Sequence, residues 1–314
     1  MILVAGEALI DIVNNNANTT EFTAIMGGSA YNVACALGIL ETQPTFACPI
    51  STDSFGDLLL KGLEKHGVSV GLTPRVSAPT PLAIVNFTAD NQPSYSFYRQ
   101  GTADRAIDQF ALEDAVPNNT KMLHITGFCL NDADDYTHWM KLVHALKDNN
   151  GIISVDPNVR AGLITNEEEY RERIQSLMAL AHVVKVSDED LAYLYPNMTL
   201  ENAKQVLAST TQLAIITLGS QGSEAFWNGQ RISVSSFRLS ELVDTVGAGD
   251  CFSAAYLYGL HTLAITKPTE IADLSPDQLS SLLTFASAAA AINCGRKGCQ
   301  PPSISEINVF LKKQ

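Results

Sequence analysis

The sequence has little positive charge: 20 Lys and Arg against 33 Asp and Glu give a net charge of −13 over 314 residues. An acidic surface repels nucleic acid and anionic lipid, so we expect neither nucleic acid nor a membrane as a partner. It also repels anionic small molecules. Any phosphate site must therefore build its positive potential locally, from helix N-termini and a metal ion.

Long apolar runs are also absent. The longest lies around Leu282–Ile292, well short of the ~20 residues that a membrane-spanning helix needs. The N-terminus, MILVAGEALIDIV, lacks a basic segment and is interrupted by Glu7 and Asp11, which favours a core strand over a signal peptide. The six cysteines form no CxxC pair, which indicates reduced, mostly buried thiols. These absences predict a cytoplasmic protein.

Short apolar runs alternate with helical patterns along the chain. Their spacing predicts buried strands at Ile2–Ala5, Thr45–Ile50, Met122–Ile125, Ile152–Val155, Val183–Val186 and Ala214–Leu218. It predicts helices at Ser29–Leu40, Phe55–His66, Tyr136–Asp148, Glu167–Ala181 and Leu200–Ala208. This is the pattern of an α/β fold with a mostly parallel central sheet and helices on both faces. Ligands of such sheets bind outside the carboxyl ends of the strands.

Two stretches break this alternation. Val13–Ile25 is polar, and Pro81–Arg99 contains two alternating segments around a turn-rich DNQP, which is typical of hairpins. We interpret both as a small inserted β-sheet lid, with ordinary surface hairpins as the alternative. The predicted division is an α/β core of residues 1–12, 26–80 and 101–314, and a lid of residues 13–25 and 81–100.

The segment DTVGAGD at 244–250 carries the clearest chemical signal. Helical spacing after it predicts a helix that begins near Gly249 or Asp250, with Gly247 and Gly249 exposing backbone amides at an anion-binding helix start. A carboxylate beside a phosphate site repels the ligand, so Asp250 makes sense as the base that accepts a proton from an attacking hydroxyl. The alternative is that Asp250 caps the helix. Neither a Walker P-loop nor GxGxxG occurs in the sequence.

Three motifs follow one another along the chain: MGGSAYNVACALGIL, then TLGSQG at 217–222, then DTVGAGDCF at 244–252. Together they resemble the ribokinase-like (PfkB) family of carbohydrate kinases over nearly the whole chain. GEALIDIV, DPNVRAGLI and KVSDEDL are similar to the bacterial fructokinase-like branch. The resemblance implies a ribokinase-like fold and ATP-dependent transfer of the γ-phosphate to a primary hydroxyl of a ketohexose, fructose first.

Other substrates and one other class of function stay open. Within the same class they are 2-keto-3-deoxygluconate, ribose and a nucleoside. The non-enzymatic alternative is a sugar- or nucleotide-sensing protein on the same fold.

The resemblance assigns roles at the phosphate end. Asp250 becomes the general base, and the backbone of Gly247, Ala248 and Gly249 becomes the anion hole. The residues implied to bind ATP are Lys185, Ser187, Thr217, Gly219, Gly222, Gly249 and Asn293.

At the sugar end, glycines before a helix allow close approach of a ligand, and a carboxylate can accept two sugar hydroxyls. Asp11 is expected at the end of the first strand, and an aromatic and a guanidinium from the lid are expected to close over the sugar. The resemblance implies the set Asp11, Gly27, Gly28, Asn32, Phe97, Arg99 and Arg160. The alternatives are a turn residue for Asp11, a locally satisfied Asn32 and a merely solvated Arg99.

The metal motif of the family, NxxE, appears here as SxxD, from Ser187 to Asp190. Asp190 keeps a carboxylate that can reach Mg²⁺ through water, since Mg²⁺ retains several waters. The resemblance also implies a potassium-like ion at Asp244 and Val246, where Val246 offers only its carbonyl. It implies a homodimer formed through the lid.

Overall fold

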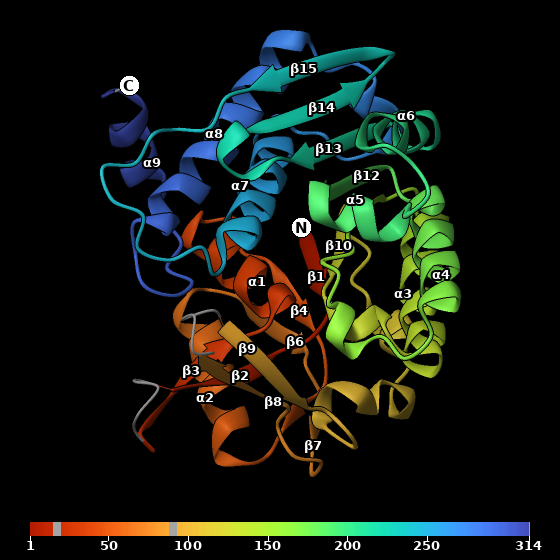
Figure 1. The fold of residues 1–314 in the computed structure, drawn as a ribbon. Coiled ribbons are helices and arrows are strands. Elements are labelled where there is room, and N and C mark those ends of the chain that lie inside the picture. The colour runs from red at the N-terminus through yellow and green to blue at the C-terminus, as the bar shows by residue number, and fades with distance from the viewer. Residues whose placement is uncertain (15–19, 88–92, 314) are drawn as a thin grey trace.

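The computed structural model describes residues 1–14, 20–87 and 93–313 (Figure 1). A nine-stranded sheet forms its centre, in the order β15-β14-β13-β12-β11-β10-β1-β4-β6. Neighbours from β6 to β13 pair in parallel, whereas β13, β14 and β15 pair antiparallel. The strands are β1 Ile2–Ala5, β4 Thr45–Ala47, β6 Ser69–Leu72, β10 Met122–Thr126, β11 Ile152–Asp156, β12 Val183–Ser187, β13 Leu213–Thr217, β14 Ser223–Trp227 and β15 Gln230–Val234.

Helices cover both faces of this sheet, as predicted. In Figure 1, α3 and α4 lie on one face, and α1, α7 and α8 lie on the other. The bounds are α1 Ser29–Ile39, α2 Ser54–Lys65, α3 Ala133–Asp148, α4 Glu167–Leu180, α5 Asp188–Leu194, α6 Leu200–Thr210, α7 Ala248–Thr262, α8 Pro276–Cys294 and α9 Ile304–Leu311. No helix among the described residues combines the length and the apolarity that crossing a membrane requires.

The parallel strands are buried on both faces, which explains their continuous apolar sequences. Leu3, Leu123, Ile153 and Val184 from four adjacent strands are all fully buried. The predicted strands and helices of the core are therefore confirmed, apart from one strand. The run Thr45–Ile50 is not a single strand, because it divides into β4 and β5 (Ile50–Ser51), and β5 pairs with β7 (Arg75–Val76) in a separate two-stranded sheet.

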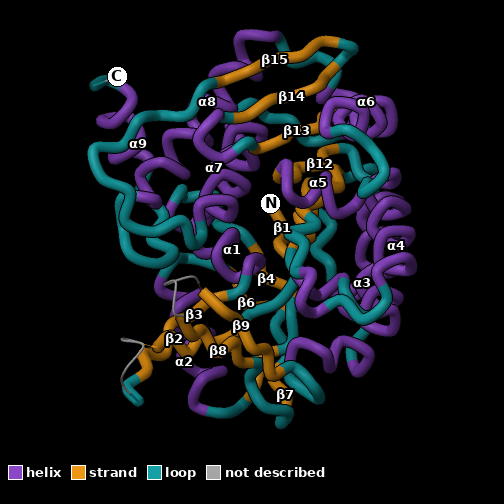
Figure 2. The backbone as a smooth tube through the Cα atoms, viewed as in Figure 1, coloured by secondary structure: helices purple, strands orange, loops and turns teal. Residues whose placement is uncertain are grey.

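A separate four-stranded sheet, the small sheet, lies at one end of the molecule (Figure 2). Its strands are β2 Leu9–Asn14, β3 Phe22–Gly27, β8 Leu82–Phe87 and β9 Pro93–Tyr98, in the order β3-β2-β8-β9. The predicted boundaries at residues 12/13 and 25/26 fall inside β2 and β3. Of the predicted DNQP turn at 90–93, residues 90–92 lie outside the described residues and Pro93 begins β9. That the small sheet acts as a lid stays a prediction.

The register of the small sheet decides which side chains share a face. Asp11 lies opposite Ile25 on β3 and Ala83 on β8, and Ala83 lies opposite Phe97 on β9. Because side chains alternate between the two faces of a strand, these residues face the same side. That side looks towards the carboxyl ends of the central parallel strands.

Candidate active site

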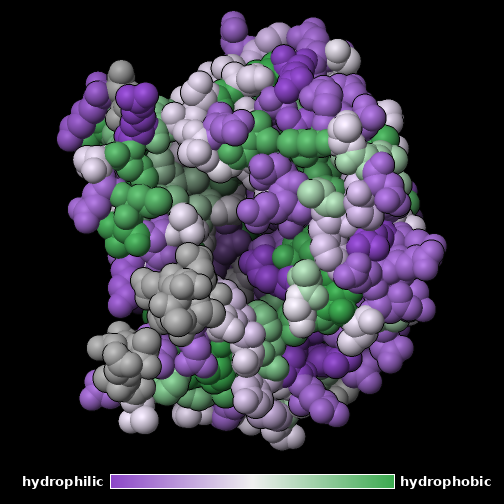
Figure 3. All heavy atoms as spheres, viewed as in Figure 1, coloured by the Kyte–Doolittle hydropathy of each residue, from purple (hydrophilic) through white to green (hydrophobic). Residues whose placement is uncertain are grey.

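A cleft of about 1300 Å³ separates the small sheet from the carboxyl edge of the central sheet. Figure 3 shows the molecule hollowed at this point. Residues that follow β1, β10, β11 and β12 line one side, and the small sheet and the start of α7 line the rest. Single-ligand pockets usually measure ~300–1,000 Å³. This cleft therefore has room for two substrates side by side.

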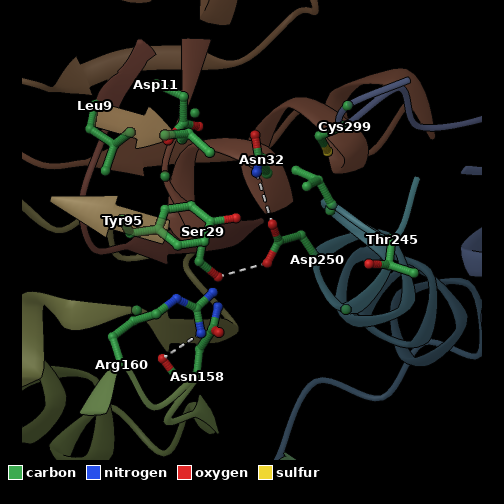
Figure 4. A pocket seen from close by; sticks show the side chains of 18 of the residues that line it. Leu9, Asp11, Ser29, Asn32, Tyr95, Asn158, Arg160, Thr245, Asp250 and Cys299 are labelled. Carbon is green, nitrogen blue, oxygen red and sulfur yellow. Dashed lines mark hydrogen bonds between the residues drawn. The ribbon is translucent and has the colours of Figure 1, made fainter. Parts of the chain in front are cut away.

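Asp250 lies in the first turn of α7 and its carboxylate is held by side chains from α1. The Ser29 hydroxyl donates to Oδ1 at 2.7 Å, and the Asn32 side-chain amide donates to Oδ2 at 2.8 Å (Figure 4). The residue that caps α7 is Gly247. Asp250 therefore does not cap its helix, and the alternative weighed from the sequence is wrong.

Burial raises the pKa of the Asp250 carboxyl, and the two hydrogen bonds from Asn32 and Ser29 oppose that rise. The carboxylate is only 8% exposed, yet it lines the cleft. A carboxylate with a raised pKa is a better proton acceptor than one in water, provided that it stays ionised at the working pH. Asp250 combines access to the cleft with the basicity that proton abstraction needs.

The start of α7 forms a positively polarised floor. Gly247 has a left-handed φ of 76°, and a Cβ added to it would lie 2.4 Å from Sγ of Cys299, so only glycine fits. Gly247 and Gly249 line the cleft, whereas Ala248 does not, and the Ala248 amide donates to the carbonyl of Thr245 at 3.2 Å. A helix N-terminus of this kind favours anions.

Lys185 adds a full positive charge beside this helix start. A Cβ added to Gly249 would lie 3.3 Å from Nζ of Lys185, and Nζ pairs with Oδ2 of Asp156 at 2.9 Å. Burial alone lowers the pKa of Lys185, but Asp156 and the nearby Asp190 and Asp250 carboxylates raise it overall. The ammonium therefore stays charged and lines the cleft beside the start of α7, although its pair with Asp156 offsets part of that charge.

Asp11 faces the cleft from the small sheet and not from the end of the first strand, which is a correction. The first strand ends at Ala5, and Asp11 sits in the middle of β2. A Cβ added to Gly27 would lie 2.2 Å from Oδ2 of Asp11, so the carboxylate needs a glycine at that position. Burial raises the pKa of Asp11 to about 6, and the positive charge of Arg160 opposes this rise.

Arg160 reaches the cleft from the loop after β11, as predicted. Figure 4 shows Arg160, Tyr95 and Asp11 around the same pocket as Asp250. Gly27, Gly28 and Asn32 line it too. Most of the predicted sugar-side residues therefore meet in one place, although their contact with a sugar stays a prediction.

Of the two residues predicted to close over the sugar, Phe97 and Arg99, only one lines the cleft. Phe97 lines the cleft. Arg99 does not: it is 8% exposed, and its guanidinium pairs with Asp104 at 2.8 Å and Asp132 at 2.7 Å. It also lies over the ring of Phe128, 4.7 Å from the centroid. The prediction that Arg99 closes over the substrate is corrected, because carboxylates of the core neutralise it.

Several cleft residues were missed by the sequence reasoning. Glu7 is the most deeply buried: it is 1% exposed, and its Oε1 accepts the Ser29 amide at 2.8 Å. Burial raises the pKa of Glu7 to about 7. The available signal was a carboxylate in an apolar N-terminal run. The others that line the cleft include Ser29, Tyr95, Asn158, Glu189, Lys297 and Cys299.

Besides Asn293, four of the residues predicted to bind ATP lie outside the cleft lining. Thr217 ends β13, and its hydroxyl donates to the Val186 carbonyl at 3.3 Å. Gly219 and Gly222 flank the short turn that follows, and Ser187 caps α5. All four lie at the carboxyl edge of the sheet, so a role towards ATP stays a prediction for them.

Asn293 is corrected, because it is fully buried and both ends of its amide are used. Its Nδ2 donates to the Val246 carbonyl at 2.8 Å, and its Oδ1 accepts the Gln300 amide at 2.7 Å. It therefore braces the loop before α7 against the chain after α8 and does not face a nucleotide.

Asp190 is corrected as a metal residue. Its Oδ1 accepts the Val159 amide at 2.9 Å and its Oδ2 accepts the Ser187 amide at 3.0 Å, and the residue is 8% exposed. Within residues 1–14, 20–87 and 93–313, no group of three or more His, Cys, Asp or Glu side chains is placed to hold a metal. The only acidic residue of the SxxD segment that lines the cleft, within those ranges, is Glu189.

The loop implied to hold a monovalent cation is held by hydrogen bonds of the chain itself. The carboxylate of Asp244 accepts the Val246 amide at 3.0 Å through Oδ1 and the Gly298 amide at 2.8 Å through Oδ2. The Val246 carbonyl accepts the side-chain amide of Asn293. Both residues implied as ligands therefore already accept N–H donors of the chain, and that they also bind a cation stays a prediction.

Comparison with known proteins shows which family the chain belongs to. The pfkB family of carbohydrate kinases matches residues 1–306. "Probable fructokinase-4" of Arabidopsis thaliana is 31% identical over 322 residues, which cover 99% of this chain and 97% of that protein. A fructokinase of Rhizobium leguminosarum bv. trifolii is 32% identical over 292 residues, 89% of this chain and 85% of the relative. The crystal structure of a fructokinase with bound ATP from Xylella fastidiosa superposes with a TM-score of 0.91 at 29% identity, covering 100% of this chain and 98% of that one.

Proposed function

Because the chain belongs to the pfkB family of carbohydrate kinases, we propose that it is an ATP-dependent fructokinase, which transfers the γ-phosphate of ATP to a primary hydroxyl of fructose. One observation carries the proposal. Asp250, held by Ser29 and Asn32, lies at the positive start of α7 in a cleft that also contains Asp11 and Arg160. A base, an anion site and a polar sugar surface thus share one cavity.

In this proposal Asp250 takes the proton of the attacking hydroxyl, which becomes the nucleophile. The amides of Gly247 and Gly249 and the ammonium of Lys185 stabilise the negative charge on the transferring phosphoryl group. Magnesium arrives as the ion complexed to ATP, so it belongs to the substrate. The small sheet closes over the sugar and excludes water, which prevents hydrolysis of ATP in place of transfer.

The names of the relatives support fructose as the first substrate to test. 2-Keto-3-deoxygluconate, ribose and nucleosides remain as alternatives within the family. The test is a panel of these compounds with Mg·ATP in a coupled assay of ADP release, with the Asp250→Asn variant beside the wild type. Fructose-dependent ADP release that Asp250→Asn abolishes supports the proposal.

Two results would contradict it. If ADP release is fastest with another sugar, that sugar and not fructose is the substrate. Binding of a sugar, measured by calorimetry, with no ADP release for any compound would favour the sensing protein instead.

We also propose that two copies pair through their small sheets, in the cytoplasm. Phe22, Met26 and Tyr98 of that sheet are 43%, 41% and 63% exposed. Exposed apolar side chains on a sheet favour association. Light scattering that shows only the monomer mass of 33.8 kDa would remove the dimer from the proposal.

A further inference from the structure

The loop that carries Arg160 turns sharply after β11. Asn158 adopts a left-handed φ of 43°, and its amide donates to Oδ1 of Asp156 at 3.1 Å. Asparagine tolerates this conformation better than most residues, but such a backbone persists only where neighbours hold it. The residues that hold this loop therefore decide where Arg160 points.

Asp190 holds the residue that follows the turn. Its Oδ1 accepts the amide of Val159 at 2.9 Å, while its Oδ2 accepts the amide of Ser187 at the start of α5. Hydrogen bonds from backbone amides to a carboxylate are among the stronger ones in proteins. The side chain is thus a bridge between the start of α5 and the loop after β11.

Val159 is also the residue on which the Arg160 side chain rests. The Nη1 group of Arg160 donates to the carbonyl of Val159 at 3.1 Å and to the carbonyl of Asn158 at 3.2 Å. The Val159 residue is therefore fixed at its amide by Asp190 and supports the guanidinium through its carbonyl. If Asp190 releases the amide, the support of the guanidinium moves with it.

We propose that Asp190 is a positioning residue for sugar recognition, which fixes Val159 so that Arg160 faces the cleft. The carboxylate of the SxxD motif thereby serves the sugar side of the site. This inference rests on the proposed function, because the contact between Arg160 and the sugar is part of that proposal. It predicts that Asp190 controls the KM for the sugar and leaves the requirement for Mg²⁺ alone.

The first test compares Asp190→Ala with a matched control. In α8, Gln278 occupies the same capping position, and its Oε1 accepts the Ser275 amide at 2.8 Å, but Gln278 does not line the cleft. Asp190→Ala should raise the KM for the sugar roughly tenfold, as expected for one lost charge-assisted hydrogen bond. The KM for ATP and the Mg²⁺ concentration for half-maximal rate should not change. Gln278→Ala should leave all three constants unchanged.

Should Asp190→Ala not fold, Asp190→Asn provides the same test. Asparagine has one carbonyl oxygen for two amides, so the KM for the sugar should rise by a smaller factor. A shift in the Mg²⁺ requirement with an unchanged KM for the sugar would overturn the proposal for either variant.

A double variant separates positioning from general loosening of the loop. Arg160→Gln should raise the KM for the sugar by itself, and adding Asp190→Ala should raise it no further, because both changes remove the same contact. If the KM of the double variant rises by the product of the two single increases, Asp190 acts independently of Arg160, and the proposal is overturned.

Hydrogen exchange of the loop after β11 tests whether Asp190 holds that loop, and it does not depend on enzyme activity. Amides of residues 158–163 should exchange roughly tenfold faster in Asp190→Ala than in the wild type, and at the wild-type rate in Gln278→Ala. If the wild type phosphorylates no sugar, the proposed function fails, but the exchange still decides whether Asp190 holds the loop. Unchanged exchange in Asp190→Ala overturns the inference whatever the substrate.

Discussion

The hydroxyl of Ser29 donates to Oδ1 of Asp250 at 2.7 Å, across 221 positions of the chain. Ser29 begins α1 and also exchanges a hydrogen bond with Thr126 at the end of β10. The Ser29 amide in turn donates to the buried Glu7. The candidate base is thus oriented by the start of another helix, which is itself anchored to the end of β10 and to the segment between β1 and β2.

Removal of the Ser29 hydroxyl should slow turnover and move its pH dependence. The hydrogen bond to Asp250 favours the ionised carboxylate, so Ser29→Ala should raise the pKa of Asp250 further. Turnover needs the ionised form and is lost as the pH falls through that pKa. The acid limb of kcat/KM should therefore move to higher pH, with kcat roughly tenfold lower at neutral pH.

Ser287→Ala serves as the control, because Ser287 is equally buried in α8 but lies outside the cleft lining. A pH profile of Ser29→Ala that coincides with the wild type would contradict the proposed role of its hydroxyl.

Glu7 should make the protein less stable as the pH rises. Its folded-state pKa of about 7 lies above the ordinary 4.5, mainly because of burial. The folded state therefore keeps a proton that the unfolded state loses. The contribution of this proton to the free energy of unfolding is fully present below about pH 4.5. It is lost as the pH rises through 7, by about 3 kcal/mol in all.

Glu7→Gln should flatten this dependence, since the amide oxygen can still accept the Ser29 hydrogen bond. Denaturant unfolding at pH 5 and at pH 8 measures how much the free energy of unfolding changes with pH. The surface variant Glu64→Gln serves as the control. A wild type and a Glu7→Gln variant with equal slopes against pH would contradict the role of Glu7.

Arg99→Ala should destabilise the protein strongly. The change leaves the buried carboxylate of Asp104, at 1% exposure, without its guanidinium partner. It also removes the longer of the two arginine contacts of the buried Asp135, which keeps its pair with Arg105 at 2.8 Å. Breaking a buried ion pair from one side typically costs about 3–5 kcal/mol. The matched control is Arg75→Ala, whose pair with the exposed Asp57 should contribute at most about 1 kcal/mol. Melting curves of the two variants decide, and equal small losses would show that Arg99 is not a structural anchor.

The loop before α7 should work without potassium. Replacing KCl by choline chloride at constant ionic strength should change kcat of the wild type less than about twofold, because Asn293 already satisfies the Val246 carbonyl. In Asn293→Ala that carbonyl loses its donor, so kcat should fall and added K⁺ should restore part of it. Strong activation of the wild type by K⁺ would show that the cation displaces these N–H donors.

The sequence was sufficient for β1, β4 and β10 to β13 of the central sheet because these strands are continuous apolar runs between helical patterns, but it did not predict β6, β14 or β15. It was insufficient for Asp11, since the apolar residues on both sides of Gly6 look like one strand. Gly6 has a φ of 141°, and the chain leaves the central sheet there and starts the small one. The β14–β15 hairpin carried an unused signal: Asn228-Gly229 stands between two alternating segments, and both residues adopt positive φ.

The site could be located from its motifs, but its internal partners could not. Asp104 is only five residues from Arg99, but Arg99 meets Asp132 and Asp135 only where the end of β9 packs against the start of α3, and no local pattern encodes that contact. From the sequence Asp190 was expected only as a metal residue, whereas in the structure it is the third residue of a capping box with Ser187. It also accepts the amide of Val159, a contact that sequence spacing does not reveal.

The position of β1 has a consequence for synthesis of the chain. This first strand lies between β4, which follows within fifty residues, and β10, which begins only at Met122. On the ribosome, one side of β1 therefore waits as an unpaired apolar edge until β10 has emerged. Unpaired strand edges are where nascent chains aggregate. A slower supply of chain, or a chaperone that covers Ile2–Ala5, should thus improve the yield of folded protein more than any change at the C-terminal helix.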